Sequence, residues 1–213
     1  EAPVFLLNSG ETESTVIDGF RFESTGGLGI WLISSSATLR NLEFNGLGDT
    51  YGSAIRHESG TLTIESCEFT GGFAEWGGQI FSQNASMVIE SSTFVENASL
   101  QSGGALYAVD SDIQISNSTF EGNDTEFLGG AVTLVRSTGW VDGSHFIENT
   151  SHSGGSIAVE DGELTSSNNT FDDSTAEFGA GIYVSTCYDP PEDEEVEESV
   201  DDCTIDEVDV IGH

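Results

Sequence analysis

The side chains that could carry out acid–base or nucleophilic catalysis are few in this sequence, and they stand far apart. It contains no lysine, and its four arginines and four histidines follow no spacing that a catalytic motif requires. On the regular part of the chain the adjacent acidic pairs are Glu160 with Asp161 and Asp172 with Asp173, and we interpret both as solvated corners. Cys67 takes a position that small or aliphatic residues hold in neighbouring repeats, so we expect a buried side chain and no nucleophile. These residues predict that the protein is not an enzyme; the less favoured alternative is a polysaccharide lyase or hydrolase.

The net charge restricts the partners of the protein. The 213 residues include 38 acidic and 4 basic side chains, which gives a formal net charge of −34. Such a surface repels nucleic acids and anionic membranes, and an acidic polysaccharide would need bridging calcium. The longest apolar run, residues 27–33, is far shorter than the ~18 residues of a membrane-spanning helix, so we expect no membrane insertion. The chain begins at Glu1 without a methionine or a basic leader, and we expect a processed chain or a fragment that is secreted or exposed on a cell surface.

A repeat of about 25 residues runs through the sequence. Six phenylalanines recur at spacings of 25, 25, 26, 26 and 25 residues: Phe44, Phe69, Phe94, Phe120, Phe146 and Phe171. After each of them comes a pair of small residues and then an aliphatic residue, and a less regular copy around Phe22 raises the number of repeats to seven. Apolar residues alternate with serine, threonine and asparagine within each repeat, which is typical of short strands and not of helices.

Strands this short can bury their apolar side only by stacking on the next repeat. We therefore predict an all-β fold, a right-handed parallel β-helix or solenoid of about seven to eight coils, whose hand follows from the rule for parallel crossovers. The six phenylalanines are expected to stack inside it as one core ladder. Residues 1–185 are assigned to the coils, residues 186–203 to an acidic insertion loop bracketed by cysteines, and residues 204–213 to a terminal strand that continues the solenoid.

Two short motifs carry a resemblance to a known family. One is the small pair followed by an aliphatic residue, present from residue 52 to residue 182, and the other is F-x-x-N, present in three repeats as Phe94 to Asn97, Phe120 to Asn123 and Phe146 to Asn149. The combination resembles the repeats of the chlamydial-type polymorphic outer-membrane proteins. That resemblance implies a right-handed β-helix exposed on a cell surface, usually as an adhesive passenger.

The asparagines of the second motif have a structural role that can be predicted. Standing at turns, they can bond the backbone amides of the adjacent coil and form an asparagine ladder. Six asparagines also begin N-x-S/T sequons, which would accept glycans in a secreted eukaryotic or archaeal protein: Asn84, Asn97, Asn117, Asn123, Asn149 and Asn168. A chain this rich in serine, threonine and asparagine also produces sequons by composition alone.

An aromatic stripe is expected on the outside of the solenoid. The outward position next to the aliphatic column is aromatic in four of seven repeats: Trp31, Phe81, Tyr107 and Tyr183. Such a stripe could stack on sugar rings or pack against another subunit. The alternative is that it reflects only the β-propensity of aromatic residues on a half-covered sheet.

The acidic loop predicts a disulfide and leaves a metal site open. In an oxidising compartment Cys187 and Cys203 would pair across it, and Cys67 would stay free. Its carboxylates could hold Ca²⁺, although the spacing of a calcium loop is lacking: Glu192, Asp193, Glu194, Asp201 and Asp202. No cofactor is otherwise required.

The function that the sequence favours is structural. We expect an extracellular protein that assembles with identical subunits into a surface layer, filament or sheath, because no capping helix accompanies the terminal strands and bare strand edges invite addition. The alternative is an adhesin or carbohydrate-binding module that recognises a surface glycan through the aromatic stripe.

Overall fold

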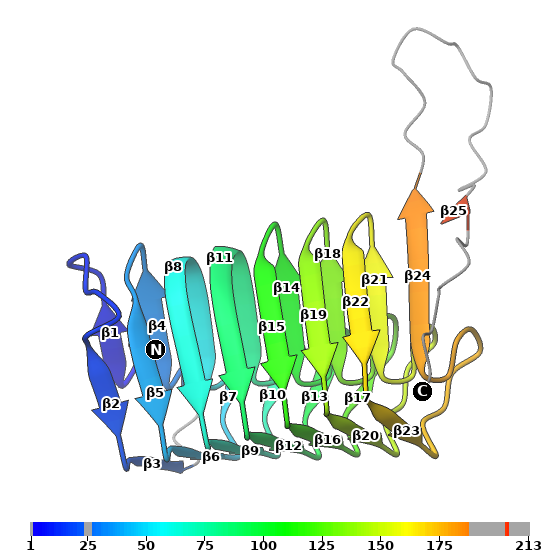
Figure 1. Ribbon diagram of the computed structural model, residues 1–213. Helices are drawn as coiled ribbons and strands as arrows, with labels where there is room; N and C mark the ends of the chain where they lie inside the picture. Colours follow the sequence, from blue (N-terminus) through cyan, green and yellow to red (C-terminus); the bar gives the residue numbers. More distant parts are fainter. Residues whose placement is uncertain (1, 24–26, 188–202, 205–213) are drawn as a thin grey trace, which may run out of the picture.

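The predicted solenoid is confirmed. The computed structural model describes residues 2–23, 27–187 and 203–204, and in these residues every regular element is a β-strand. Successive coils stack in register along one axis from β1 to β24 (Figure 1). The coils pair in parallel in three sheets, which we call the long sheet, the phenylalanine sheet and the short sheet; the short sheet takes a strand from only four of the coils. No described residues form a helix of the length and apolar character that crossing a membrane requires.

The long sheet has two rows of strands that meet at a corner. Its first row is β1 (Phe5–Leu7), β4 (Ile30–Ile33), β8 (Ile55–Glu65), β11 (Ile80–Glu90), β14 (Leu106–Val109), β18 (Val132–Val135), β21 (Ile157–Glu160) and β24 (Ile182–Cys187). Its second row is β2 (Val16–Asp18), β5 (Ala37–Arg40), β15 (Asp112–Ser116), β19 (Thr138–Asp142) and β22 (Glu163–Ser167), and the long strands β8 and β11 run through both rows.

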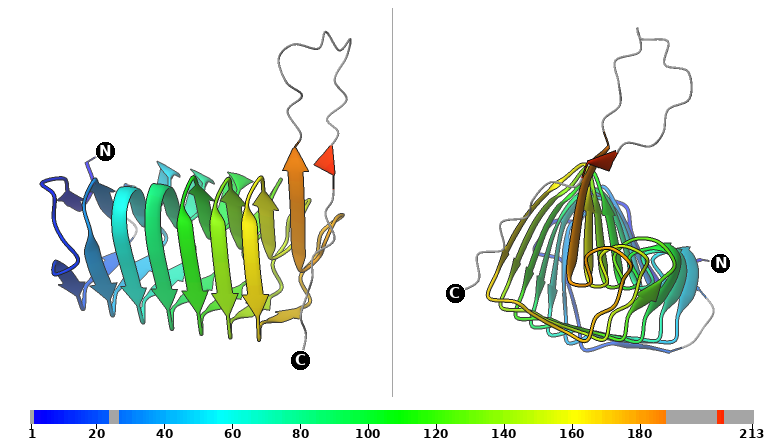
Figure 2. Two further views of the ribbon diagram at one scale, coloured as in Figure 1. Left: turned by 45° about the horizontal axis from the view of Figure 1, so that its top comes forward. Right: turned by 90° about the vertical axis from the view of Figure 1, so that its right-hand side faces the viewer.

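The other two sheets complete each coil. The phenylalanine sheet contains β3 (Arg21–Glu23), β6 (Glu43–Asn45), β9 (Glu68–Thr70), β12 (Thr93–Val95), β16 (Thr119–Glu121), β20 (His145–Ile147) and β23 (Thr170–Asp172). The short sheet contains β7 (Gly48–Tyr51), β10 (Phe73–Trp76), β13 (Ala98–Ser102) and β17 (Asp124–Thr125). Seen along the axis, the strands of successive coils superimpose, and the chain curls at one side of the cross-section before it re-enters the long sheet (Figure 2).

The phenylalanine column forms the centre of the core. The rings from Phe22 to Phe171 stack with adjacent centroids 4.5 to 5.1 Å apart and with interplanar angles of at most 12°. These separations equal the spacing of hydrogen-bonded strands, so the register of the coils holds the rings parallel, although isolated aromatic pairs prefer offset or edge-to-face contact.

The small pairs are explained by the turn that precedes the first row. In the pair formed by Gly103 and Gly104, the first glycine has φ of +69°, a conformation that favours glycine. A Cβ on Gly104 would collide with the carbonyl oxygen of Gly130 in the next coil. The first glycine therefore makes the turn, and the second lets the neighbouring coils approach.

Buried polar side chains form ladders beside the phenylalanines. The Asn123 amide nitrogen donates to the Phe94 carbonyl at 3.1 Å and to Asn149 Oδ1 at 2.9 Å, and Asn123 Oδ1 accepts from the backbone N–H of Asn97 at 3.2 Å. All three asparagines are fully buried, so the predicted asparagine ladder is confirmed. Each of these amides satisfies turn groups that a buried backbone would otherwise leave unpaired.

Only one residue of the expected terminal strand is described. Of residues 204–213, only Thr204 lies within the described residues, where it forms β25 (Cys203–Thr204) with Cys203. This pair of residues lies antiparallel to β24, with Thr204 opposite Thr186, whereas a further coil of the solenoid would pair in parallel. The described part of this segment therefore turns back along β24 and does not begin a new coil.

One polar pair inside the core lacks partners. His57 is fully buried in the first row, between Leu32 and Ser82 in the neighbouring strands, and neither of its ring nitrogens nor Ser82 Oγ has a hydrogen-bond partner. Burial lowers the pKa of His57 from 6.5 to about 4, because the charged imidazolium would be desolvated.

The pKa of His57 predicts a loss of stability in mild acid. Between pH 6.5 and about 4 the unfolded chain binds a proton at His57 that the folded chain does not, so the free energy of unfolding falls as the pH decreases through this range. From pH 7.5 to 4.5 we expect a loss of about 2–3 kcal/mol from this residue. His57→Leu, which matches Leu32 in the same column, should remove that part of the pH dependence when urea unfolding is measured at both pH values. An equal loss in both proteins would contradict the assignment.

Candidate functional site

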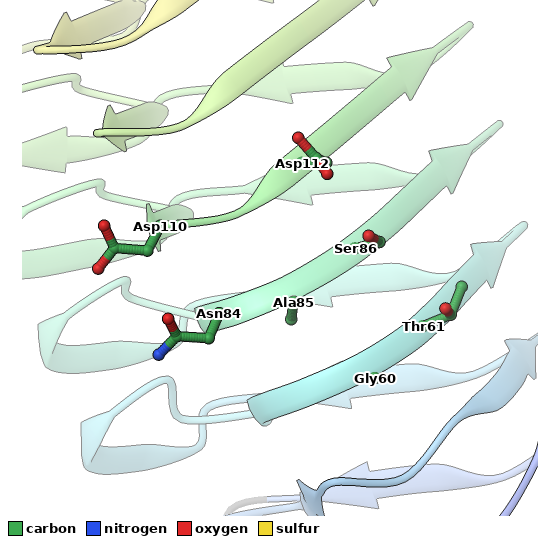
Figure 3. Close-up of a pocket in the computed structure, with 7 residues that line it drawn as sticks. All are labelled: Gly60, Thr61, Asn84, Ala85, Ser86, Asp110 and Asp112. Carbon is green, nitrogen blue, oxygen red and sulfur yellow. The ribbon is translucent and has the colours of Figure 1, made fainter.

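A shallow groove lies on the outside of the long sheet, over the corner between its two rows. The first part of it, about 450 Å³ in volume, is shown in Figure 3. It is lined by Gly60, Thr61, Asn84, Ala85, Ser86, Asp110 and Asp112. A second depression of about 270 Å³ shares Ser86 and Asp112 with the first and extends to Gln114, Thr138 and Trp140. We call the two together the corner groove.

The corner groove is positioned by residues in the left-handed conformation. At this corner Asn84, Asp110 and Arg136 have φ of 51°, 50° and 45°, and they stand on successive coils. Asparagine and aspartate tolerate this conformation better than most residues, because their short polar side chains can bond locally. The sharp corner leaves their side chains on the outside of the solenoid, as Figure 3 shows for Asn84 and Asp110.

Trp140 provides the apolar part of the groove. Its side chain is 40% exposed, and it follows Val88 and Gln114 in one outward column of the second row. A tryptophan that exposes this much apolar area on a flat sheet, beside a carboxamide and a carboxylate, offers a stacking surface with polar groups around it.

An ion pair fixes the charges at the edge of the groove. Arg136 binds Asp110 through two hydrogen bonds, Nε to Oδ1 at 2.9 Å and Nη2 to Oδ2 at 3.0 Å. The hydrogen bond from Arg136 lowers the pKa of Asp110, and the carboxylate raises the pKa of the Arg136 guanidinium. Both groups therefore stay charged at neutral pH, which makes Asp110 a poor general acid and Arg136 a poor base.

The predicted aromatic stripe has a different environment from the one expected. Trp31, Arg56, Phe81 and Tyr107 do lie on adjacent strands in one register, with Tyr183 further along the same column. Phe81, however, is only 7% exposed, so its assignment to an interaction stripe is wrong.

Two aromatic residues of the short sheet cover the stripe. The Tyr51 ring lies 5.0 Å from that of Phe81, and the Trp76 ring lies 5.0 Å from that of Tyr107. These residues make a small outer core, which the sequence did not reveal, because alternation shows which way a side chain points but not which segment folds over it.

Arg56 belongs to the same outer core. Its guanidinium carbon lies 4.7 Å from the Trp31 ring centroid and 5.0 Å from that of Tyr51, and its Nε lies 2.5 Å from Glu58 Oε1. Packing between two rings and an ion pair holds this arginine in place. The stripe thus joins the short sheet to the long sheet.

Three of the six sequons are excluded as glycan acceptors in the folded protein. Asn97, Asn123 and Asn149 are fully buried in the asparagine ladder. The other three asparagines are exposed at corners of the coils: Asn84, Asn117 and Asn168.

The cysteines and the predicted calcium ligands are only partly described. Cys187 and Cys203 are opposite each other in the antiparallel pair of β24 and β25, which is a backbone placement compatible with the predicted disulfide. Glu192, Asp193, Glu194, Asp201 and Asp202 lie outside the described residues. Elsewhere in the described chain no group of three or more His, Cys, Asp or Glu side chains could hold a metal ion.

Comparisons with known proteins concern the fold. A family model described as "right handed beta helix region" matches residues 4–192, and its hand agrees with the predicted one. No curated protein matches the sequence. Among solved structures, that of PfbA, a surface adhesin of Streptococcus pneumoniae, aligns over 97% of this chain and 81% of its own with 9% identity. Its TM-score is 0.22, which is too low to carry an argument about function.

Counting thiols tests both the burial of Cys67 and the disulfide. Cys67 is buried, and burial raises its pKa to about 11, so it should not react with a thiol reagent in the native protein. We expect no reactive thiol in the native state, one after denaturation and three after denaturation with a reductant. Cys67→Ser, which matches Ser92 in the next coil, should lower the second count to zero. Three thiols after denaturation alone would exclude the disulfide.

Proposed function

The chain belongs to the family of right-handed β-helix regions, and from that premise we propose that it is a non-enzymatic, extracellular surface protein that binds a neutral glycan in the corner groove. The observation that carries the proposal is the exposed indole of Trp140 in a groove with Gln114 and Asp112. A pyranose ring can stack on an indole while its hydroxyl groups bond to the amide, carboxylate and hydroxyl groups around it.

The charge of the protein selects the class of glycan. The net charge is −34, and Asp110 and Asp112 are both in the groove. Acidic polysaccharides would be repelled unless a cation bridged them, whereas a neutral glycan meets no such barrier. The groove is open and follows the sheet across the strands from Thr61 to Trp140, which suits an extended chain of sugars better than a single small molecule.

The absence of catalysis is part of the proposal. Within the described residues, Asp110 of the groove is bound by Arg136 in an ion pair with two hydrogen bonds, and no histidine lines either depression. A lyase would need a base that is unprotonated near neutral pH, and a hydrolase would need a carboxylic acid that is protonated near neutral pH. The ion pair opposes the first role for Arg136 and the second for Asp110.

A second candidate function, assembly with identical subunits, has its own observation. The first described coil exposes four apolar side chains: Val4, Leu6, Val16 and Phe20, each between 47% and 57% exposed. Among the described strands, none pairs with the outer edges of β1, β2 and β3. An open strand edge with apolar side chains favours addition of another strand.

The glycan proposal predicts binding that depends on Trp140. Affinity electrophoresis through soluble β-glucans, xylans and mannans should retard the protein in at least one of them. Trp140→Ala should weaken that binding about tenfold, the loss expected for one ring contact and its buried area. The matched control is Thr63→Ala, in the same outward column but outside the groove. The proposal fails if no neutral polysaccharide binds, or if the two variants bind equally well.

Assembly predicts association that increases with salt. Sodium chloride screens the repulsion between acidic subunits, so sedimentation velocity should show larger species at 1 M than at 0.1 M. Leu6→Glu should prevent association, whereas Leu100→Glu, an equally exposed leucine on the short sheet, should not. A monomer under all conditions, with or without EDTA, rejects this candidate.

A further inference from the structure

The outer face of the short sheet and of the turns that continue it carries a row of exposed apolar side chains. The row consists of Phe73, Leu100, Phe127 and Phe178, which are 49%, 46%, 50% and 45% exposed. They stand on four of five successive coils; in the remaining coil the His152 ring lies 5.6 Å from that of Phe178. We call these four residues the apolar row. Phe73 is in register with Ala98, two residues before Leu100, and Phe178 is in register, through Ser153, with Leu128, one residue after Phe127. The row therefore runs obliquely across successive coils.

Extra residues in two coils place part of this row on the surface. The register between β10 and β13 shifts between Ala74 and Trp76, so β13 holds one residue more than its neighbour. This bulge contains Leu100. The next coil keeps the extra residue, because Leu128 follows its bridge partner Ser102 by 26 residues, whereas Ser153 follows Leu128 by 25. Phe127 lies in the stretch that contains this extra residue. Bulges commonly redirect a side chain, and here both insertions expose an apolar one.

The surroundings of the apolar row are acidic. Four exposed carboxylates flank it: Glu75, Asp124, Glu126 and Glu177. None of the four arginines of the chain belongs to the short sheet, and the described cation-forming side chain nearest to the row is His152, whose Nδ1 lies 3.4 Å from Glu177 Oε2. A surface with an apolar centre and a rim of one charge is typical of a site that binds a partner.

We propose that the apolar row is a docking surface for a basic amphipathic helix of another protein, laid along the row and thus obliquely across the coils. Charge complementarity selects this occupant, because lysine and arginine beside the helix would meet the four carboxylates. A second copy of this chain would bring a net charge of −34 against them, and an anionic membrane or nucleic acid would also be repelled.

The spacing of the coils suits a helix. Coils in this solenoid are 4.5 to 5.1 Å apart, as the stacked rings show, and one turn of an α-helix rises about 5.4 Å. Over the four steps from Phe73 to Phe178 the two repeats diverge by only about 2–3 Å, less than the length of a leucine or phenylalanine side chain. A helix whose apolar residues recur at positions i, i+3, i+4, i+7 and onward along the same face could therefore contact the row in the four coils that carry its side chains.

The test uses a labelled synthetic peptide of 16 lysines and leucines with the leucines on one helical face. Two further peptides serve as controls, one with the same composition in scrambled order and one in which glutamate replaces lysine. Fluorescence anisotropy at physiological ionic strength should show binding of the amphipathic basic peptide about tenfold tighter than of the scrambled one, and no binding of the acidic one. Equal affinity for the two basic peptides would overturn the proposal, since charge alone would then explain binding.

Variants of the row complete the test. Leu100→Ser with Phe127→Ser should weaken the amphipathic peptide about tenfold and leave the scrambled peptide unchanged, whereas Trp140→Ala should change neither. Both replaced side chains are half exposed, so folding should be preserved; Phe73→Ser is the second variant if the double one unfolds. Unchanged binding to a folded row variant overturns the proposal. If the row variants instead abolish self-association of the protein, the row is an interface between copies and the proposal is wrong.

Discussion

Every other feature of this protein depends on the register between its coils. Each coil leaves its backbone N–H and C=O groups to be paired by the next, and this pairing requires equivalent strands of neighbouring coils to lie in register. The phenylalanine rings follow the same spacing, with centroids 4.5 to 5.1 Å apart. Where two coils are one residue longer, the extra residue is placed on the short sheet and its continuing turn, so the interior columns stay in register. The surface therefore takes up the variation that the core does not tolerate.

Polar residues stabilise the same register at the places where the chain turns. Beside the phenylalanines, Ser92 Oγ accepts from the Cys67 N–H at 3.1 Å and Ser118 Oγ accepts from the Ser92 N–H at 3.2 Å, in a column parallel to that of the asparagines. A buried hydrogen bond contributes only about 1 kcal/mol net, but leaving its partner unpaired costs more. These ladders thus act mainly against a shifted register, which would leave many groups unpaired at once. His57 and Ser82 are an exception, because they lie in the apolar first row without partners.

The two proposed binding surfaces lie on different parts of each coil and have different chemistry. The corner groove combines one exposed indole with amide, carboxylate and hydroxyl groups on the long sheet, whereas the apolar row combines phenyl and leucyl side chains with a rim of carboxylates on the short sheet. Neither includes the aromatic stripe, of which Phe81 and Tyr107 contribute to the small outer core. Because the two surfaces share no residue, a substitution in one leaves the side chains of the other in place.

The sequence alone determined the solenoid, its repeat and its interior. The constant spacing from Phe44 to Phe171 implies one residue per coil, and the asparagines three residues later imply a ladder, because a parallel stack brings equivalent positions together. Only the tertiary structure decided the outside. The buried state of Phe81, the exposure of Trp140 and the groove beside it depend on which segments fold over which face, and the period of two in a strand does not contain that information. The period of two assigns each side chain to one side of the sheet, whereas the burial of that side chain depends on which other segment covers that side.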